Sequence, residues 1–174
     1  MRVGTRINRM LITYFALIIM NKQLLKAGGI LFLFTIALWA ADDPIVGTWK
    51  LNLFKSNQAA LATFRSLTAK VESRPDGLKV SEELVTPQGV AIHSEFTAKY
   101  DGMDYPVVGD PYFDTVSLTH TDPKHANATW KKAGRVVAVA QNVISPDGKT
   151  WTETIATRDA QGKDVTIVAV YDKQ

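Results

Sequence analysis

The chain has 174 residues, no cysteine, and 20 basic against 17 acidic side chains. The missing cysteine excludes a disulfide-stapled fold and a lipid-modified cysteine anchor, so an exported domain must be held by its core or by oligomerisation. Five basic residues and no acidic residue precede Asp42, so residues 42–174 carry 15 basic and 17 acidic side chains, a net charge near −2. This balance lacks the basic footprint of a nucleic-acid-binding protein, and we expect no nucleic-acid partner.

Residues 27–41 form an apolar run, AGGILFLFTIALWAA, that follows Lys22 and Lys26 and ends in Ala40 and Ala41. A basic segment, an apolar core and small residues at the exit are the parts of a secretory signal. The run is shorter than the roughly 20 apolar residues that a membrane-spanning helix needs. We therefore expect residues 1–41 to be a leader with a signal helix that directs the protein to the periplasm or the outside. The alternative is a membrane tether formed by an uncleaved leader.

Met20 stands where a signal peptide would start, so residues 1–19 are interpreted as an extension from an upstream start codon. Cleavage near Ala41 or Asp42 would leave residues 42–174 as one domain of ordinary size with no stable membrane span.

Turn-forming residues divide the rest of the chain into short alternating segments. Gly, Pro and Asp cluster at 74–77, 86–89, 101–102, 132–134, 145–148 and 159–162. Between the turns, Val, Thr, Ile and aromatic residues alternate with polar ones, as in half-buried strands. This pattern predicts an all-β fold with strands near 45–52, 66–73, 78–85, 90–100, 104–108, 114–120, 127–132, 135–145, 149–158 and 164–172. One short helix is expected at 57–64, after the first strand.

Short turns between successive strands favour a single antiparallel up-and-down meander. A sheet of this many strands curls and closes, which removes its exposed edges. We therefore expect a closed barrel of about 8–10 strands.

Two short motifs carry a resemblance to known proteins. Gly47-Thr48-Trp49 resembles the G-x-W opening of lipocalins and fatty-acid-binding proteins, and Val170-Tyr171-Asp172-Lys173 resembles the closing strand of the latter. The segment 94–107 is similar to bacterial exported lipocalin-like proteins of unassigned role. The resemblance implies a small calycin-type barrel with an internal cavity, in which Trp49 packs across the base.

The last strand departs from the fatty-acid-binding pattern. There the resemblance leads us to expect R-x-Y, with an arginine that grips the lipid carboxylate, but Ala169 occupies the arginine position before Tyr171. Capture of a carboxylate in that manner is therefore not expected of this chain.

Strand alternation places large apolar residues on one face, with single polar residues in the middle of it. A dry core should not repeat such placements, because a buried polar group is costly unless it is hydrogen-bonded. A hydrated binding cavity tolerates them. On strand 135–145 the same alternation turns Val137, Val139 and Val143 inward. The predicted cavity residues are Glu82, Ser94, Phe96, Trp130, Gln141, Trp151 and Glu153.

The alternative is a bulge that shifts the alternation and turns the polar members of this set toward solvent. If the alternation holds, the wall has carboxylates and no evident cation, and the predicted ligand is small, partly apolar, and neutral or cationic.

No catalytic arrangement or cofactor motif is visible. There is no G-x-S-x-G elbow, cysteine nucleophile or phosphate-cradling glycine loop. His93 with Glu95, and His120 with Asp122 and His125, fall short of the three or four converging ligands of a zinc site, so we predict no metal.

The leading functional hypothesis is a non-enzymatic binding barrel for a small apolar ligand. A structural or interaction module with a filled core is the alternative, and a barrel enzyme acting on a lipophilic substrate is a third. No protein partner can be named.

Overall fold

The computed structural model describes residues 43–174, and the predicted leader lies outside them. These residues form ten antiparallel strands and one short helix. No helix in this range is both long and apolar enough to cross a bilayer. The elements are β1 (Gly47–Leu51), α2 (Gln58–Thr63), β2 (Ser66–Arg74), β3 (Gly77–Val85), β4 (Ala91–Ala98), β5 (Tyr105–Val108), β6 (Thr115–Asp122), β7 (His125–Lys132), β8 (Arg135–Ile144), β9 (Thr150–Arg158) and β10 (Asp164–Lys173).

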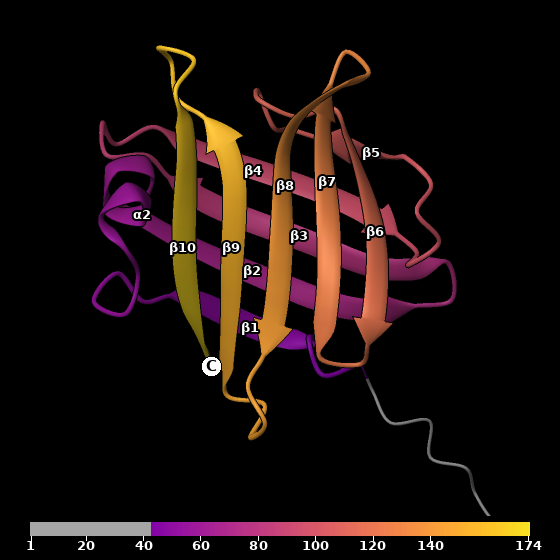
Figure 1. Ribbon diagram of the computed structural model, residues 1–174. Coiled ribbons are helices and arrows are strands. Elements are labelled where there is room, and N and C mark those ends of the chain that lie inside the picture. Colours follow the sequence, from indigo (N-terminus) through magenta and orange to yellow (C-terminus); the bar gives the residue numbers. More distant parts are fainter. Residues whose placement is uncertain (1–42) are drawn as a thin grey trace, which may run out of the picture. The chain divides into compact units, whose positions relative to one another are not determined.

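Each strand pairs with its neighbours in the chain, and β1 pairs with both β2 and β10, so the sheet closes into a barrel. In Figure 1, β6 to β10 stand in front, and β1 to β4 cross steeply behind them. The predicted all-β, up-and-down barrel with one helix after the first strand is confirmed. The turn residues predicted the strand boundaries well, because glycine and proline favour backbone conformations that end a strand.

The helix α2 begins at Asn57, whose side chain accepts a hydrogen bond from the Ala60 backbone N–H at 3.0 Å. Such a cap satisfies one of the free N–H groups of the first turn. Ala60 and the following Phe64 are buried in the core, so the helix covers the barrel end at which β1 finishes.

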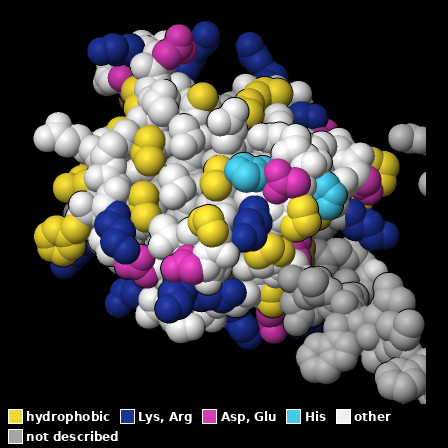
Figure 2. Space-filling view, turned by 60° about the horizontal axis from the view of Figure 1, so that its bottom comes forward, with side chains coloured by type: hydrophobic (Ala, Val, Ile, Leu, Met, Phe, Trp, Pro, Cys, Tyr) yellow, Lys and Arg dark blue, Asp and Glu magenta, His cyan; other side chains and the backbone are white. Residues whose placement is uncertain are grey.

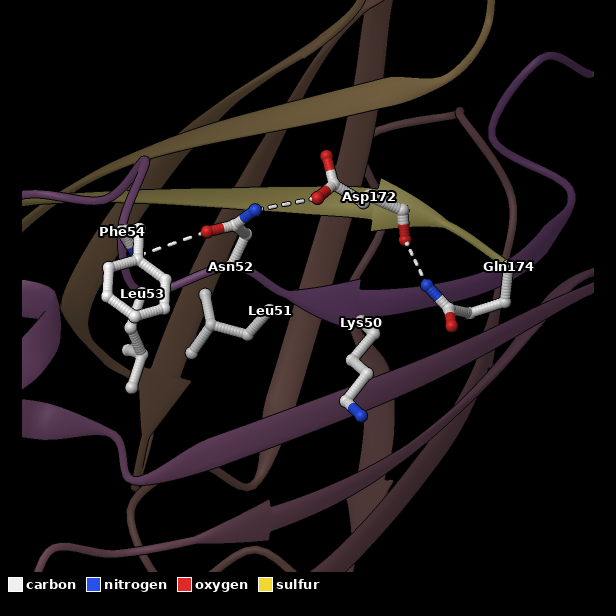
Figure 3. A pocket seen from close by; sticks show the side chains of 7 residues that line it. All are labelled: Lys50, Leu51, Asn52, Leu53, Phe54, Asp172 and Gln174. Atoms are coloured by element: carbon white, nitrogen blue, oxygen red, sulfur yellow. Dashed lines mark hydrogen bonds between the residues drawn. The ribbon is translucent and has the colours of Figure 1, made fainter.

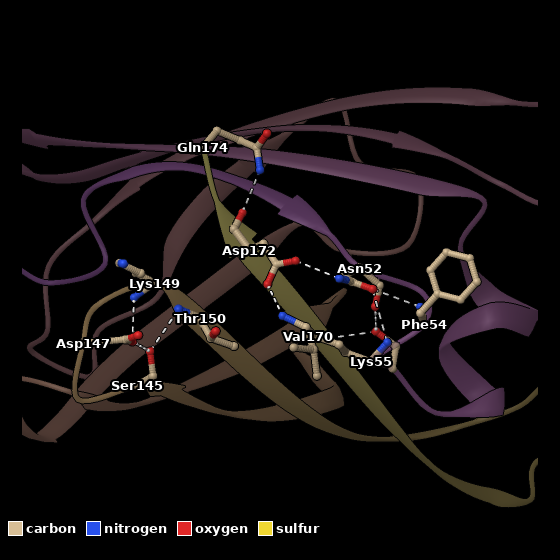
Figure 4. A network of polar contacts seen from close by, with 11 residues as sticks. Asn52, Phe54, Lys55, Ser145, Asp147, Lys149, Thr150, Val170, Asp172 and Gln174 are labelled. Atoms are coloured by element: carbon tan, nitrogen blue, oxygen red, sulfur yellow. Dashed lines mark hydrogen bonds and ion pairs between the residues drawn. The ribbon is translucent and has the colours of Figure 1, made fainter.

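A polar network holds the seam between β1 and β10. The Asp172 carboxylate accepts a hydrogen bond from the Asn52 side chain and pairs with Lys55 Nζ, both at 2.7 Å (Figure 4). Asn52 in turn accepts hydrogen bonds from the Phe54 and Lys55 backbone N–H groups. The network therefore fixes the chain as it leaves β1, next to the strand that closes the barrel.

Aromatic rings fill the barrel near this seam. Trp151 stacks on Tyr171 with ring centroids 4.5 Å apart, and Trp49 meets Trp151 edge-on at 6.0 Å. Trp49 is fully buried, and its indole N–H donates to the Ile45 carbonyl at 2.7 Å. This agrees with the base-packing role that the resemblance implied for Trp49.

Strand β8 differs from the prediction. An extra residue, Val137, lies between the pairs Trp130↔Ala138 and Lys131↔Val136 and forms a β-bulge. The buried positions of β8 are Ala138, Ala140, Asn142 and Ile144, whereas Val137, Val139, Gln141 and Val143 are exposed.

The prediction that Val137, Val139 and Val143 point inward was therefore wrong. Trp130 on β7 points inward directly opposite Ala138, whose small side chain leaves room for the indole, whereas Trp151 on β9 lies opposite Ile144.

Gly77 opens β3 with φ +138°, and a Cβ there would collide with the Ala98 carbonyl oxygen of β4. We predict that Gly77→Ala lowers the free energy of unfolding by roughly 2–4 kcal/mol, because strain and a backbone clash add together. Gly162→Ala is the matched control: φ is also positive, but the space is open, so it should cost only roughly 1–2 kcal/mol. Equal urea midpoints for the two variants would contradict the predicted close approach of β3 and β4.

Candidate functional site

An interior cavity of about 50 Å³ lies toward the barrel end at which β1 begins. Roughly 10–15 Å³ of such space holds one water molecule, so the cavity has room for about three to five. The lining contains two glutamates and no lysine, arginine or histidine. It consists of Ile45, Val71, Leu78, Val80, Glu82, Phe96, Tyr100, Leu118, Ala126, Ala128, Trp130, Asn142, Trp151 and Glu153.

The two glutamates have similar surroundings on opposite parts of the barrel. Glu82 on β3 lies between Ala69 and Ser94 of the adjacent strands. Glu153 on β9 lies between Ala169 and Asn142. Each carboxyl group thus has a small alanine on one side and a neutral polar side chain on the other. None of these four neighbours supplies a positive charge.

Each glutamate has one weak hydrogen bond from a hydroxyl group. Ser94 donates to Glu82 at 3.4 Å, and Tyr171 donates to Glu153 at 3.3 Å. Ser94 and Glu153 are 5% and 9% exposed, whereas Glu82 is half-buried. The Tyr171 phenol is itself buried, and burial together with the nearby carboxylates raises its pKa well above the usual value. Tyr171 is therefore a fixed donor to Glu153.

Burial dominates the electrostatics of both carboxyl groups. It raises the pKa of Glu82 to about 7, with a further contribution from the negative charge of Asp110 and an opposing one from Ser94. It raises the pKa of Glu153 to about 8, with a further contribution from Glu82 and an opposing one from Tyr171. An uncompensated carboxylate is costly in such surroundings, so near neutral pH the pair retains protons.

Aromatic side chains form much of the wall. Phe96 meets Trp130 edge-on, with centroids 5.5 Å apart. The Trp151 indole N–H donates to the Asn142 side-chain oxygen at 2.8 Å, which fixes the ring. Burial and the nearby Asp43 raise the pKa of Tyr100, so its phenol stays neutral. The site therefore combines neutral aromatic faces with two protonatable carboxyl groups.

Of the predicted cavity residues, Glu82, Phe96, Trp130, Trp151 and Glu153 line the cavity. Ser94 is not part of the cavity lining, but its hydroxyl group donates a hydrogen bond to Glu82. Gln141 is exposed on the outer face, and that placement was wrong because of the bulge in β8.

Asn142, which was not among the predicted cavity residues, takes the inward position instead. The small Ala138 and Ala140, spaced two apart beside Asn142, were the signal that marks the true inner face of this strand.

A surface hollow of about 310 Å³ lies outside the barrel along the β1–β10 seam. Figure 3 shows its lining, in which the Asn52 side chain donates a hydrogen bond to the Asp172 carboxylate. It is an open groove whose polar groups serve the seam, so it is not the candidate site.

Histidine and acidic side chains lie side by side on the surface (Figure 2). His93 contacts Glu83 at 2.6 Å and His125 contacts Asp122 at 2.8 Å. His120 is exposed, and its ring lies against the Tyr100 ring with centroids 4.6 Å apart. Within residues 43–174 no group of three or more metal-ligating side chains converges.

Comparison of the sequence with protein families and with curated proteins gives no match. Among solved structures, the chain is similar to zebrafish ileal bile acid-binding protein complexed with cholic acid, at 16% identity and a TM-score of 0.43, over 75% of this chain and 99% of that one. It is also similar to the siderocalin Ex-FABP, at 16% identity and a TM-score of 0.31, over 75% of this chain and 71% of that one. At this distance the likeness concerns the barrel fold and carries no argument about a ligand.

The raised carboxyl pKa values predict an unusual dependence of stability on pH. The unfolded carboxyl groups titrate near 4.5, whereas the folded ones titrate near 7 and 8. The folded state therefore holds more protons between about pH 4.5 and 8, so stability is highest at the acid side of this window and falls as pH rises. We predict a loss of at least about 1.4 kcal/mol, the equivalent of one pKa unit, between pH 5 and 8.5.

Urea unfolding at the two pH values measures this loss. Glu153→Gln mimics the protonated acid and should flatten the pH dependence and raise stability at pH 8.5. The control Glu72→Gln removes a surface carboxyl group whose pKa is lowered by Lys70 and Arg74, so it should leave the pH dependence between pH 5 and 8.5 unchanged. A wild-type stability that rises from pH 5 to 8.5 contradicts the burial of these groups.

Proposed function

We propose that this barrel is a non-enzymatic binding protein that takes up a small, partly apolar molecule, neutral or cationic, in its interior. The observation that carries the proposal is the composition of the cavity: aromatic walls, two carboxyl groups and no basic side chain in the lining. Strongly perturbed ionisable groups gathered in one cavity are typical of functional sites.

The charge of the cavity supports exclusion of anions. A fatty acid or another carboxylate would place a second negative group beside Glu82 and Glu153 without a cation to offset it. Ala169, directly opposite Glu153, occupies the position where the fatty-acid-binding pattern has arginine. A neutral or positively charged molecule meets no such penalty.

The size of the cavity limits the ligand. Binding pockets for drug-sized molecules measure roughly 300–1,000 Å³, whereas this interior offers about 50 Å³. The fitting ligand replaces a few water molecules. The same small volume favours the second candidate function, a structural or interaction module with a nearly filled core, and a ligand test separates the two.

The contacts of the polar groups favour binding over catalysis. Glu82 and Glu153 are hydrogen-bonded to different hydroxyl groups, and His120 is exposed rather than in the cavity lining. No nucleophile and base lie together among the described cavity residues, so a barrel enzyme is the least favoured reading.

We further propose that the protein acts after export, with residues 1–41 as its cleaved leader. Basic residues, an apolar core and terminal alanines support this proposal. The cysteine-free barrel needs no disulfide in an oxidising compartment.

Three molecules of one shape but different charge test the ligand preference: choline, 3,3-dimethyl-1-butanol and 3,3-dimethylbutanoate. Trp130 and Trp151 line the cavity, so their fluorescence reports occupancy. At pH 7.5 we expect choline or the alcohol to bind at least tenfold more tightly than the acid, a difference of about 1.4 kcal/mol. Tighter binding of the acid would refute the proposal, and no response to any of the three would favour the filled-core module.

The intact mass of the protein, expressed from its full sequence in its own host, tests the leader. We expect a species that begins near Ala41 or Asp42 and is recovered outside the cytoplasm. A mass that retains residues 20–41 in the membrane fraction would instead support an uncleaved tether.

A further inference from the structure

We infer that the cavity binds a small organic cation of the substituted-ammonium type in exchange for a proton held by the Glu82–Glu153 pair. The inference rests on the proposed function and names its ligand class. It comes from the arrangement of the two carboxyl groups, their neutral neighbours and the aromatic wall.

Among residues 43–174, no lysine, arginine or histidine pairs with either carboxyl group or lines the cavity. The residues opposite them on adjacent strands are Ala69, Ser94, Ala169 and Asn142, all uncharged. The negative charge of Asp110 opposes ionisation of Glu82, and that of Glu82 opposes ionisation of Glu153. The weak hydrogen bonds from Ser94 and Tyr171 act in the other direction. Tyr100, the remaining titratable group of the lining, also favours its neutral form.

The empty cavity is therefore closest to neutral when both carboxyl groups carry protons. An entering cation changes this preference, because a positive charge a few ångströms from a carboxyl group favours its ionised form. One carboxyl group then loses its proton to bulk solvent and pairs with the ligand. The proton leaves as the cation arrives, so the charge of the buried site is the same before and after binding.

The aromatic walls of the cavity suit the alkyl groups and the positive charge of a substituted ammonium ion. Trp130, Trp151, Phe96 and Tyr100 present aromatic rings to the cavity. Aromatic faces attract ammonium groups, with tryptophan the strongest, and aromatic cages recognise quaternary ammonium ions. Three to five displaced waters, at about 30 Å³ each, correspond to roughly 90–150 Å³, the bulk of a small alkylammonium ion.

Because binding releases a proton, the affinity for the cation must depend on pH in a defined way. Below pH 7 both carboxyl groups are protonated in the free protein, so each bound cation must expel one proton. The dissociation constant for choline should therefore rise tenfold for each pH unit lowered between 6.5 and 5.5. Above pH 8 at least one carboxyl group, Glu82, is already ionised in the free protein, and the dissociation constant should become nearly independent of pH. The neutral isostere 3,3-dimethyl-1-butanol should not show the tenfold rise on acidification.

The experiment measures choline and 3,3-dimethyl-1-butanol binding by tryptophan fluorescence from pH 5.5 to 8.5, on the full-length gene product purified from its own host. Glu82→Gln/Glu153→Gln retains the shape and hydrogen-bonding capacity of the protonated pair. It should lose at least tenfold in choline affinity at pH 8 and keep the affinity for the alcohol, which also shows that the cavity is intact. Glu83→Gln, on the outer face of the same strand as Glu82, should behave as wild type.

The outcomes separate the two proposals. If the alcohol binds but choline does not, or if choline affinity is constant from pH 5.5 to 8.5, the cation exchange is wrong and the binding barrel stands. Choline affinity that survives in the double glutamine variant also overturns the exchange. If neither molecule binds at any pH, both proposals fail.

Discussion

Closure of the sheet by the short strand β1 is the constraint on which the rest of the barrel depends. Four residues of β1, Gly47–Lys50, pair with β2, and three, Trp49–Leu51, pair with β10. Without that pairing, β2 and β10 would both be edge strands with unpaired backbone groups. The polar network of Asn52, Lys55 and Asp172 stands at this seam, and Trp49 anchors it from the inside. Because the ring is complete, inward side chains such as Trp49, Glu153 and Tyr171 are buried, and Glu82 is half-buried.

That enclosure raises the pKa values of the interior carboxyl groups. On an open sheet Glu82 and Glu153 would face water and ionise normally. Inside the barrel they lie among aromatic and aliphatic side chains, and their only close polar partners in the described chain are hydroxyl groups. Because a buried negative charge is unfavourable, both carboxyl groups keep their protons to a higher pH than in water. The interior is thus a site whose charge responds to pH and, in our proposal, to a ligand.

The sequence was sufficient for the architecture and for part of the site. Turn chemistry located all ten strands, because glycine, proline and aspartate restrict where the backbone can reverse. Alternation correctly turned Glu82, Ser94 and Glu153 inward, since β3, β4 and β9 pair with their neighbours without a bulge.

The same reasoning failed at Gln141, because one extra residue in β8 moves the whole strand to the opposite alternation. Choosing the inner face by hydrophobicity favoured the valines, whereas the position opposite the inward Trp130 is occupied by the small Ala138. The bond from Tyr171 to Glu153, and the small volume left between the rings, depend on three-dimensional packing and have no signature in a linear pattern.

The central claim is that two carboxyl groups inside the closed barrel hold their protons near neutral pH. A carbon-13 NMR titration of the glutamate side chains measures this directly, with assignment from the Glu82→Gln and Glu153→Gln variants. The account predicts two resonances that titrate near pH 7 and 8. Titration of every glutamate below pH 5.5 would contradict it.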